Sequence, residues 1–191
     1  MEIINKTKFL ENEDFFLSEI EKGKIFVYPT DTIYGIGCDA TNSESIKRIR
    51  EIKMRDNKPF SVIVPNKTWI KDNCVINFLA GKWINKLPGR YTLILKLKNL
   101  NVVARKELLG DFYTLGIRIP DNWFAEIIEK FGKPFVTTSV NLAGREYLTS
   151  IEDLDPNIKA KIDYIIDEGK LENLPSKIVD LTNGEKIIRR Y

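Results

Sequence analysis

The stretch KIFVYPTDTIYGIG, at residues 24–37, decides how this sequence can fold. Its apolar beginning, residues 24–28, ends at Pro29 and predicts a buried β-strand. Hydroxyl, carboxylate and glycine residues then follow, up to Gly35 and Gly37. This change is typical of a place where backbone approaches a ligand closely, although a turn rich in Thr and Asp would give the same pattern. The stretch is not a dinucleotide fingerprint, because the third glycine is absent and no helix is predicted directly after it.

Apolar runs of strand length recur outward from this stretch. They predict strands at residues 60–64, 91–97, 113–119, 135–138, 164–166, 177–181 and 185–190. Helical patterns predict helices at residues 15–22, 41–53, 76–86 and 121–131 and a short one from Ser150, with Thr41 and Asp121 as N-caps. Several strands follow one another without a helix, which indicates the α/β class, a twisted mixed sheet with helices packed on it. Because the sequence has no repeat or linker, we expect a single domain over residues 1–191.

The composition limits the chemistry that this chain can perform. Its 191 residues are 43% hydrophobic and 30% charged, which suits a globular domain with its own core. The sequence contains no histidine, which excludes Ser-His-Asp and Cys-His catalysis and argues against the common zinc sites. Chemistry must then depend on positioning and on the stabilisation of charge. The net charge of +3 permits contact with phosphates but does not establish nucleic-acid binding.

The sequence also predicts where the protein works. Its first residues, MEIINKTKFLENEDFF, include acids and no unbroken apolar stretch, so they do not resemble a signal peptide. No segment approaches the roughly 20 apolar residues that span a bilayer. Cys38 and Cys74 lie far apart and outside any CxxC pair, which favours two reduced thiols over a disulfide or a metal site. We therefore expect a cytoplasmic protein with no membrane contact and no metal bound by its own side chains.

Two further segments are unusually polar for their positions. KMRDNKP, at residues 53–59, places Lys53 and Arg55 at a predicted helix end, where they could complement the helix dipole or clamp a triphosphate. TTSVNLAG, at residues 137–144, directly follows an apolar strand, at the sheet edge where α/β proteins bind ligands. A hydrogen-bonded turn would explain it equally well. No GxxxxGK[ST] occurs, so a nucleotide would be bound without a Walker loop.

Arg118 is the conspicuous cation of the strand predicted at residues 113–119. The rest of that strand is apolar enough to be largely buried, and an unpaired buried arginine is costly. Arg118 therefore needs an anion. An acidic residue such as Asp31 and a bound ligand are both possible sources.

In order, these segments closely resemble the successive signatures of the YrdC family. The matching segments are YPTDTIYGIG at 28–37, KMR at 53–55 with Lys58 and Pro59, TLGIRIPD at 114–121, TTSVNLAG at 137–144, and PSKIVD at 175–180 with Ile188 and Arg189. The resemblance extends from about residue 24 to the end of the sequence. It is specific because five separated motifs match in order, whereas one alone would not.

The resemblance implies a YrdC-like fold and the activity of a nucleotidyltransferase. Members of the family condense L-threonine with bicarbonate to a carbamate, which attacks the α-phosphate of ATP and expels pyrophosphate. The product, L-threonylcarbamoyl-AMP, serves the threonylcarbamoyladenosine modification of tRNA. The resemblance further implies Mg²⁺ with the ATP and downstream tRNA-threonylcarbamoyl-transfer proteins as partners, and it allows contact with tRNA or double-stranded RNA.

The resemblance also assigns roles to residues. Lys53 and Arg55 match the basic pair expected at the triphosphate, and we expect both to be catalytic. For ATP binding the resemblance adds Lys58, Thr114, Ser139, Asn141 and Arg189. For threonine binding it implies Thr30, Thr32, Arg118 and Ser176. Arg118 is placed to meet the threonine carboxylate, a bidentate task that lysine would perform less well.

The sequence departs from the family pattern at several positions. Val140 stands where alanine is usual, and Lys177 stands where long forms commonly carry threonine. The segment between Arg55 and Pro59 is one residue shorter than in many relatives. Because the sequence ends at Tyr191, it resembles the short form, without the C-terminal domain of the long form.

Two other functions fit parts of the sequence. One is a non-catalytic RNA-binding module with a basic concave surface, which would show no threonine-dependent turnover. The other is an enzyme of the same fold that adenylates a different small acid, as in hydrogenase maturation. Those proteins carry zinc-finger and acylphosphatase modules that this sequence lacks, which disfavours the second alternative.

Overall fold

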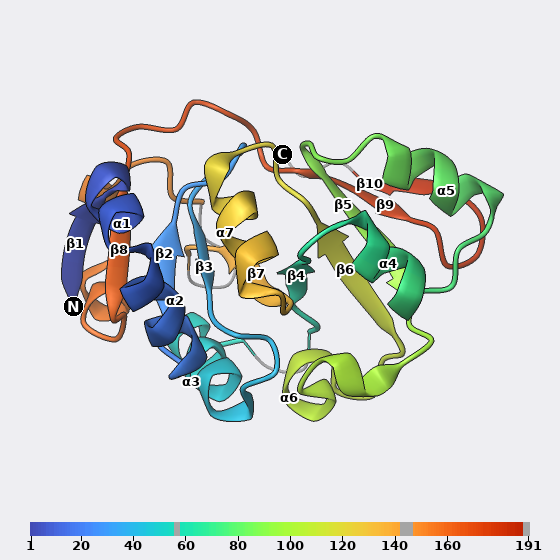
Figure 1. Ribbon diagram of the computed structural model, residues 1–191, viewed down its shortest axis with the longest axis horizontal. Coiled ribbons are helices and arrows are strands. Elements are labelled where there is room, and N and C mark those ends of the chain that lie inside the picture. The colour runs from blue at the N-terminus through green and yellow to red at the C-terminus, as the bar shows by residue number, and fades with distance from the viewer. Residues whose placement is uncertain (56–57, 142–146, 189–191) are drawn as a thin grey trace.

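A computed structural model of the chain describes residues 1–55, 58–141 and 147–188 (Figure 1). In this part of the chain, ten strands form one sheet in the order β1-β8-β2-β3-β7-β4-β6-β5-β9-β10. The strands are β1 (Glu2–Asn5), β2 (Phe26–Tyr28), β3 (Gly35–Gly37), β4 (Ser61–Ile63), β5 (Tyr91–Lys96), β6 (Thr114–Arg118), β7 (Phe135–Ser139), β8 (Tyr164–Asp167), β9 (Lys177–Asp180) and β10 (Lys186–Ile188).

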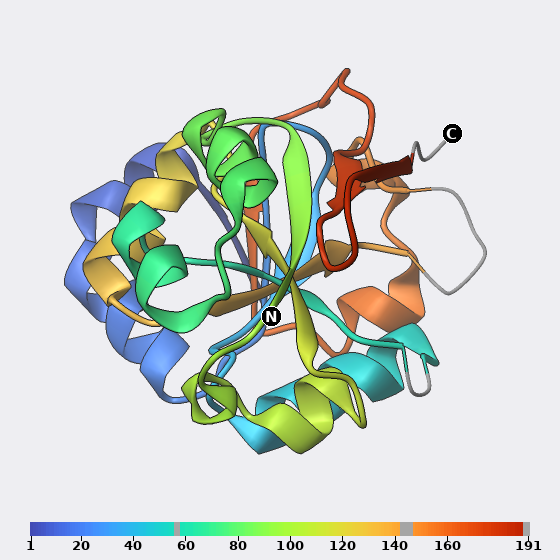
Figure 2. The same ribbon diagram turned by 90° about the vertical axis from the view of Figure 1, so that its right-hand side faces the viewer.

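The helices cover this sheet. They are α1 (Lys6–Glu11), α2 (Glu13–Glu21), α3 (Ser43–Lys53), α4 (Lys67–Asn73), α5 (Phe78–Asn85), α6 (Arg105–Leu109), α7 (Trp123–Phe131) and α8 (Pro156–Lys159), with 3-10 turns at Leu100–Val102 and Ile151–Asp153. Figure 2 shows α2 and α7 to one side of the twisted sheet, and α3 with α6 below it. Among the described residues, no helix is both long enough and apolar enough to cross a membrane.

The pairing of the strands confirms the predicted mixed sheet. Strand β4 pairs parallel with β6 and antiparallel with β7, and β2 pairs parallel with β8 and antiparallel with β3. The pairing of β3 with β7 sets Gly35 opposite Ser139. The first and third polar segments of the sequence therefore meet at the centre of the sheet, although about 100 residues separate them.

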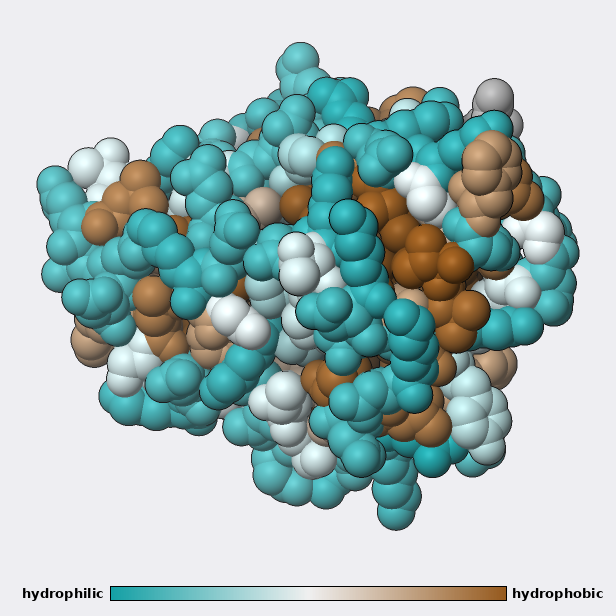
Figure 3. Space-filling view, turned by 45° about the vertical axis from the view of Figure 1, so that its right-hand side comes forward, coloured by the Kyte–Doolittle hydropathy of each residue, from teal (hydrophilic) through white to brown (hydrophobic). Residues whose placement is uncertain are grey.

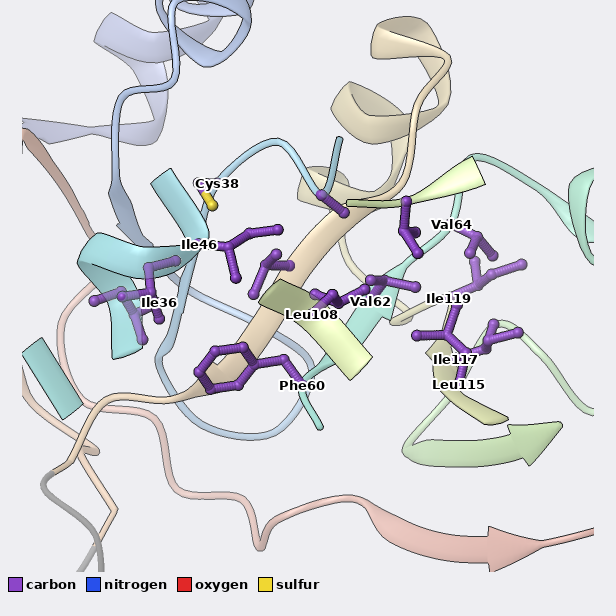
Figure 4. Packing of buried hydrophobic residues seen from close by; sticks show 14 of the residues in the cluster. Ile36, Cys38, Ile46, Phe60, Val62, Val64, Leu108, Leu115, Ile117 and Ile119 are labelled. Carbon is purple, nitrogen blue, oxygen red and sulfur yellow. The ribbon is translucent and has the colours of Figure 1, made fainter. Parts of the chain in front are cut away.

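Alternation along β2 divides the core between the two faces of the sheet. Phe26 and Tyr28 point to an aromatic cluster, while Val27 between them joins the larger aliphatic core. In the aromatic cluster, Tyr28 stacks on Phe124 with ring centroids 4.3 Å apart. Figure 4 shows part of the larger core, including Ile36, Cys38 and Phe60. A one-residue slip of β2 would exchange the side chains of these two clusters, so their packing fixes the register of β2 and the position of the polar segment after it.

Two predicted helix caps are wrong by one residue. Helix α3 is capped by Asn42, whose Oδ1 accepts from the Ser45 backbone N–H, because the Thr41 N–H and hydroxyl both bind Asp39 Oδ1 at 2.7 Å. Helix α7 begins after Asn122 rather than after Asp121. The Asp121 N–H instead donates to Asp31 Oδ2, at 3.0 Å.

The sequence patterns missed several short elements, among them β1, β3, α1, α4 and α6. Strand β3 is the most consequential because its first residue, Gly35, lines the cavity described below. It has only three residues, two of them glycines, which weakens any periodic signal. A Cβ atom at Gly37 would overlap the carbonyl oxygen of Val136 on β7, so glycine permits the close approach of these strands.

The surface is mostly hydrophilic on the face in Figure 3, with an apolar area among the polar side chains. Exposed large apolar side chains among the described residues include Phe78, Leu174 and Met54. Apolar side chains that are exposed singly are ordinary on protein surfaces.

Candidate functional site

A cavity of about 410 Å³ opens over the middle of the sheet. Its walls come from the segment after β2, from the segment that leads into β4, and from β5, β6, β7 and β9. Three of the polar segments of the sequence therefore line one space. The residues predicted for the site that line it are Thr30, Thr32, Arg55, Thr114, Arg118, Ser139 and Ser176.

Hydrogen bonds fix the first polar segment. The Thr30 Oγ1 atom donates to the Ile33 carbonyl at 2.7 Å and accepts from the Thr32 backbone N–H at 3.0 Å. The hydroxyls of Thr30 and Thr32 lie 2.8 Å apart. Both side chains are buried, so the segment is a rigid turn and a cavity wall at the same time. The hydrogen-bonded turn that the sequence offered as one interpretation is therefore confirmed, while the approach of a ligand stays a prediction.

Lys53 lies behind the cavity wall rather than among the lining residues. Its Nζ donates to the backbone carbonyl of Ser139, to the carbonyl of Asn141 at 2.8 Å and to Asn141 Oδ1 at 3.2 Å. The lysine is only 3% exposed, and these three acceptors are uncharged. Burial lowers the pKa of Lys53 from 10.5 to about 7, and the charge of Arg55 adds to that effect.

Arg55 enters the cavity because the chain turns sharply at the end of α3. Met54 adopts a left-handed conformation with φ of 47°, which stops the helix and redirects the chain. Arg55 Nη2 donates to the Pro59 carbonyl at 2.9 Å, and its Nε is buried without a partner among the described residues. Burial lowers the pKa of this guanidinium, and the charge of Arg50 lowers it further. A buried, unpartnered N–H in a cavity can accommodate an anion.

Arg118 is held by an internal ion pair. Its Nη2 donates to Asp31 Oδ1 at 2.7 Å and lies 3.3 Å from Thr32 Oγ1. The side chains of Arg118 and Asp31 are 8% and 4% exposed. The structure thus shows the acidic-residue alternative that the sequence left open. Arg118 also lines the cavity, and its Nε has no partner within the described part of the chain.

Some of the remaining predicted residues line the cavity and others do not. Ser139 Oγ donates to Asn141 Oδ1 at 2.6 Å, and Ser176 Oγ lies 2.7 Å from Thr92 Oγ1. Lys58 is exposed and, like Asn141, is not among the lining residues. Arg189 lies outside the described residues.

Sequence reasoning missed one wall of the cavity. Thr92 and Ile94 on β5 line it, together with Ile178 and Asp180 on β9. Thr92 pairs with Ile178, and Ile94 with Asp180, so side chains at alternate positions of both strands face the same side. The alternation of residues 91–97 predicts a shared face for Thr92 and Ile94. It cannot show which face meets a ligand.

The arrangement suits an anionic ligand with a polar neighbour. Arg55 offers an unsatisfied guanidinium donor, and Thr137, Thr138 and Ser139 of β7 also line the cavity. Such preplaced donors can stabilise charge that develops during group transfer without a proton shuttle.

Comparisons with known proteins place this chain in a wider group. The family model for Sua5, YciO and YrdC, described as telomere recombination, matches residues 18–190. A Methanocaldococcus jannaschii protein provisionally named a threonylcarbamoyl-AMP synthase is 38% identical over 180 residues, which cover 92% of this chain and 82% of that protein.

Two solved structures extend this similarity to the fold. The crystal structure of E. coli YciO superposes with a TM-score of 0.82 and 28% identity, covering 98% of this chain and 93% of that one. P. abyssi Sua5, in a complex with L-threonine, superposes with a TM-score of 0.81 and 25% identity. That match covers 95% of this chain and 54% of the Sua5 chain, so this chain spans about half of Sua5.

Proposed function

Because this chain belongs to the Sua5/YciO/YrdC family, we propose that it is a threonylcarbamoyl-AMP synthase. Its substrates are then L-threonine, bicarbonate and ATP, and its products are L-threonylcarbamoyl-AMP and pyrophosphate. The threonylcarbamoyl group is destined for the modification of adenosine in tRNA. Several relatives carry this name, and P. abyssi Sua5 was crystallised with L-threonine.

One observation supports this proposal most directly. The cavity has a cationic side, at Arg55, and a charge-balanced side, at the pair of Arg118 and Asp31. A triphosphate requires an excess of positive charge, whereas a zwitterionic amino acid requires a paired, polar environment. The two substrates therefore fit different sides of the same space.

The reaction divides into two steps. The threonine amine attacks the carbon of bicarbonate and loses water to give a carbamate. A carbamate oxygen then attacks the α-phosphorus of ATP, and the bond from that phosphorus to pyrophosphate breaks. The protein must hold both partners in line and stabilise the charge on the leaving pyrophosphate.

The predicted residues have distinct tasks in this scheme. Arg55 binds the phosphates, and Lys53 holds the Ser139–Asn141 turn against the nucleotide. Thr114, Ser139, Asn141, Lys58 and Arg189 complete the ATP site. Thr30, Thr32 and Ser176 face the amino acid, and Arg118 meets its carboxylate while Asp31 balances the charge.

Mg²⁺ enters as part of the substrate, bound to ATP, because the phosphates need neutralisation beyond that from the protein's cations. The product passes to tRNA-threonylcarbamoyl-transfer proteins. Direct contact of this chain with tRNA or double-stranded RNA, and its location in the cytoplasm, stay predictions.

Pyrophosphate release tests the proposed function. We expect release from MgATP that requires both L-threonine and bicarbonate, measured across a panel of amino acids. Equal release with any amino acid, or full activity in bicarbonate-free buffer, would contradict the proposal. A non-catalytic RNA-binding module would release no pyrophosphate with any of them.

A further inference from the structure

Arg50, on the last turns of α3, is a residue that the site reasoning did not use, and it contacts two segments of the chain. Its Nε donates to the Glu107 carbonyl at 2.7 Å, and its Nη2 donates to the Leu108 carbonyl at 3.2 Å. Its Nη1 donates to the carbonyls of Lys58, at 3.2 Å, and of Arg55, at 3.4 Å. One guanidinium therefore joins the basic segment to the end of α6.

The same guanidinium shares an aromatic ring with Arg55. The Arg50 Cζ lies 4.6 Å from the centroid of the Phe60 ring, and the Arg55 Cζ lies 5.0 Å from it. Phe60 is buried, lines the cavity and donates its backbone N–H to the Leu108 carbonyl. Two like charges are thus held over one ring, which attracts both through its π face.

From these contacts, we propose that Arg50 is a positioning residue for the triphosphate of ATP. By binding the carbonyls of Arg55 and Lys58, it holds the end of α3 so that Arg55 enters the cavity. Its charge also adds to the positive potential that an incoming polyphosphate meets. The inference rests on the proposed function for the identity of the ligand, because it assumes that ATP is bound at Arg55.

The geometry requires arginine rather than any cation. The four acceptor carbonyls lie in two separate segments, and the planar guanidinium reaches them with N–H groups that point in different directions. A lysine ammonium would carry the same charge on a single nitrogen with three donors. Lysine at this position therefore separates the effect of charge from the effect of position.

Arg48 provides a matched control on the same helix. It is exposed, and its Nη2 donates to Asp163 Oδ2 at 3.1 Å, away from the cavity-lining residues. The variant Arg48→Gln removes the same charge from α3 without touching the basic segment. Arg50→Gln removes both the positive charge and the hydrogen bonds of the guanidinium, whereas Arg50→Lys removes those hydrogen bonds and keeps the charge.

ATP binding measured by titration calorimetry tests the proposal on the intact chain, with thermal melting to confirm folding. We expect Arg50→Gln and Arg50→Lys each to bind ATP about tenfold more weakly, since hydrogen bonds to charged groups have that order of effect. Arg48→Gln should bind within twofold of the wild type. In steady-state kinetics, the ATP KM should rise for both Arg50 variants while the threonine KM stays within twofold.

The possible results separate this inference from the proposed function. Wild-type binding in Arg50→Lys with loss only in Arg50→Gln would mean that Arg50 acts through charge, and would overturn its positioning role. Equal losses in Arg48→Gln would overturn it as well. If Arg50→Gln does not fold, Arg50→Lys alone decides.

If the wild type binds ATP but releases no pyrophosphate with threonine, the proposed function fails while the ATP comparison still decides the role of Arg50. A wild type that binds no ATP overturns both.

Discussion

Two buried cations at this cavity are stabilised in different ways. Lys53 is surrounded by three uncharged oxygens from Ser139 and Asn141, and we call this side, with Arg55, the basic side. Arg118 is bound to a carboxylate, Asp31, and we call this side the paired side. The charge on the basic side is therefore uncompensated by these contacts, while that on the paired side is balanced.

The difference indicates which ligand suits which side. Burial of a charge without a counter-ion is expensive, so the basic side is stabilised when an anion arrives. The paired side is already balanced in charge, so it needs no anion and suits a ligand that is oriented through directed hydrogen bonds. The Asp31 carboxylate thus accounts for the burial of Arg118 in the empty protein, whereas the burial of Lys53 beside Arg55 is explained by the proposed anionic ligand.

The largest expected effect comes from removing Arg55 on the basic side. We expect Arg55→Ala to lower kcat by about 10²–10³, the usual cost of losing one preplaced charge donor. The threonine KM should change little, because the paired side is intact. Pyrophosphate-release kinetics and a thermal melt check this. A variant that melts far below the wild type would make Arg55 structural, and normal turnover would remove it from the site.

A substitution on the paired side should have a smaller effect, and this effect should appear in the threonine KM rather than in kcat. We expect Arg118→Lys to raise the threonine KM about tenfold, with the ATP KM within twofold, because lysine keeps the charge but loses the planar fork. Lysine can still face Asp31, so the fold should persist. Steady-state kinetics with each substrate varied in turn provide the measurement. An unchanged threonine KM would assign Arg118 to the internal ion pair alone.

The need of Arg118 for an anion could be predicted from the sequence, whereas its partner could not. An arginine within an apolar strand demands a counter-charge wherever the strand lies. Asp31 meets it only because the sheet order β2-β3-β7-β4-β6 brings the segment after β2 to the end of β6, and strand order is a non-local property. The sequence named Asp31 only as one acidic candidate among others.

The fold, too, could be predicted only in part from the sequence. Apolar runs predicted the longer strands, and their succession without helices predicted the mixed sheet that the structure confirms. The three-residue strand β3 was not predicted, because glycines carry no hydrophobic signal. Thr41 was chosen as a helix cap from its spacing to Glu44, but Asp39 binds Thr41, and Asn42 takes its place. Local competition between hydrogen-bond partners decided a detail that spacing alone could not.

The smallest expected effect, and the sharpest test of the comparison, is the pH dependence that Lys53 confers. The pKa of Lys53 is about 7 in the folded protein because of burial, compared with an ordinary value of 10.5. Between these values the unfolded chain binds a proton that the folded protein does not, so the free energy of unfolding should rise with pH across this window. A bound polyphosphate favours the protonated lysine, so ATP affinity should fall over the same range, by less than about tenfold per pH unit.

Met is similar in length and has no titratable group, so Lys53→Met should remove both trends relative to the wild type. Chemical denaturation and calorimetry at roughly pH 7, 8 and 9, from the pKa of the folded protein upward, measure both trends. Parallel curves for the two proteins would show that Lys53 does not titrate here, and the contrast between the basic and the paired side would then lose its electrostatic basis.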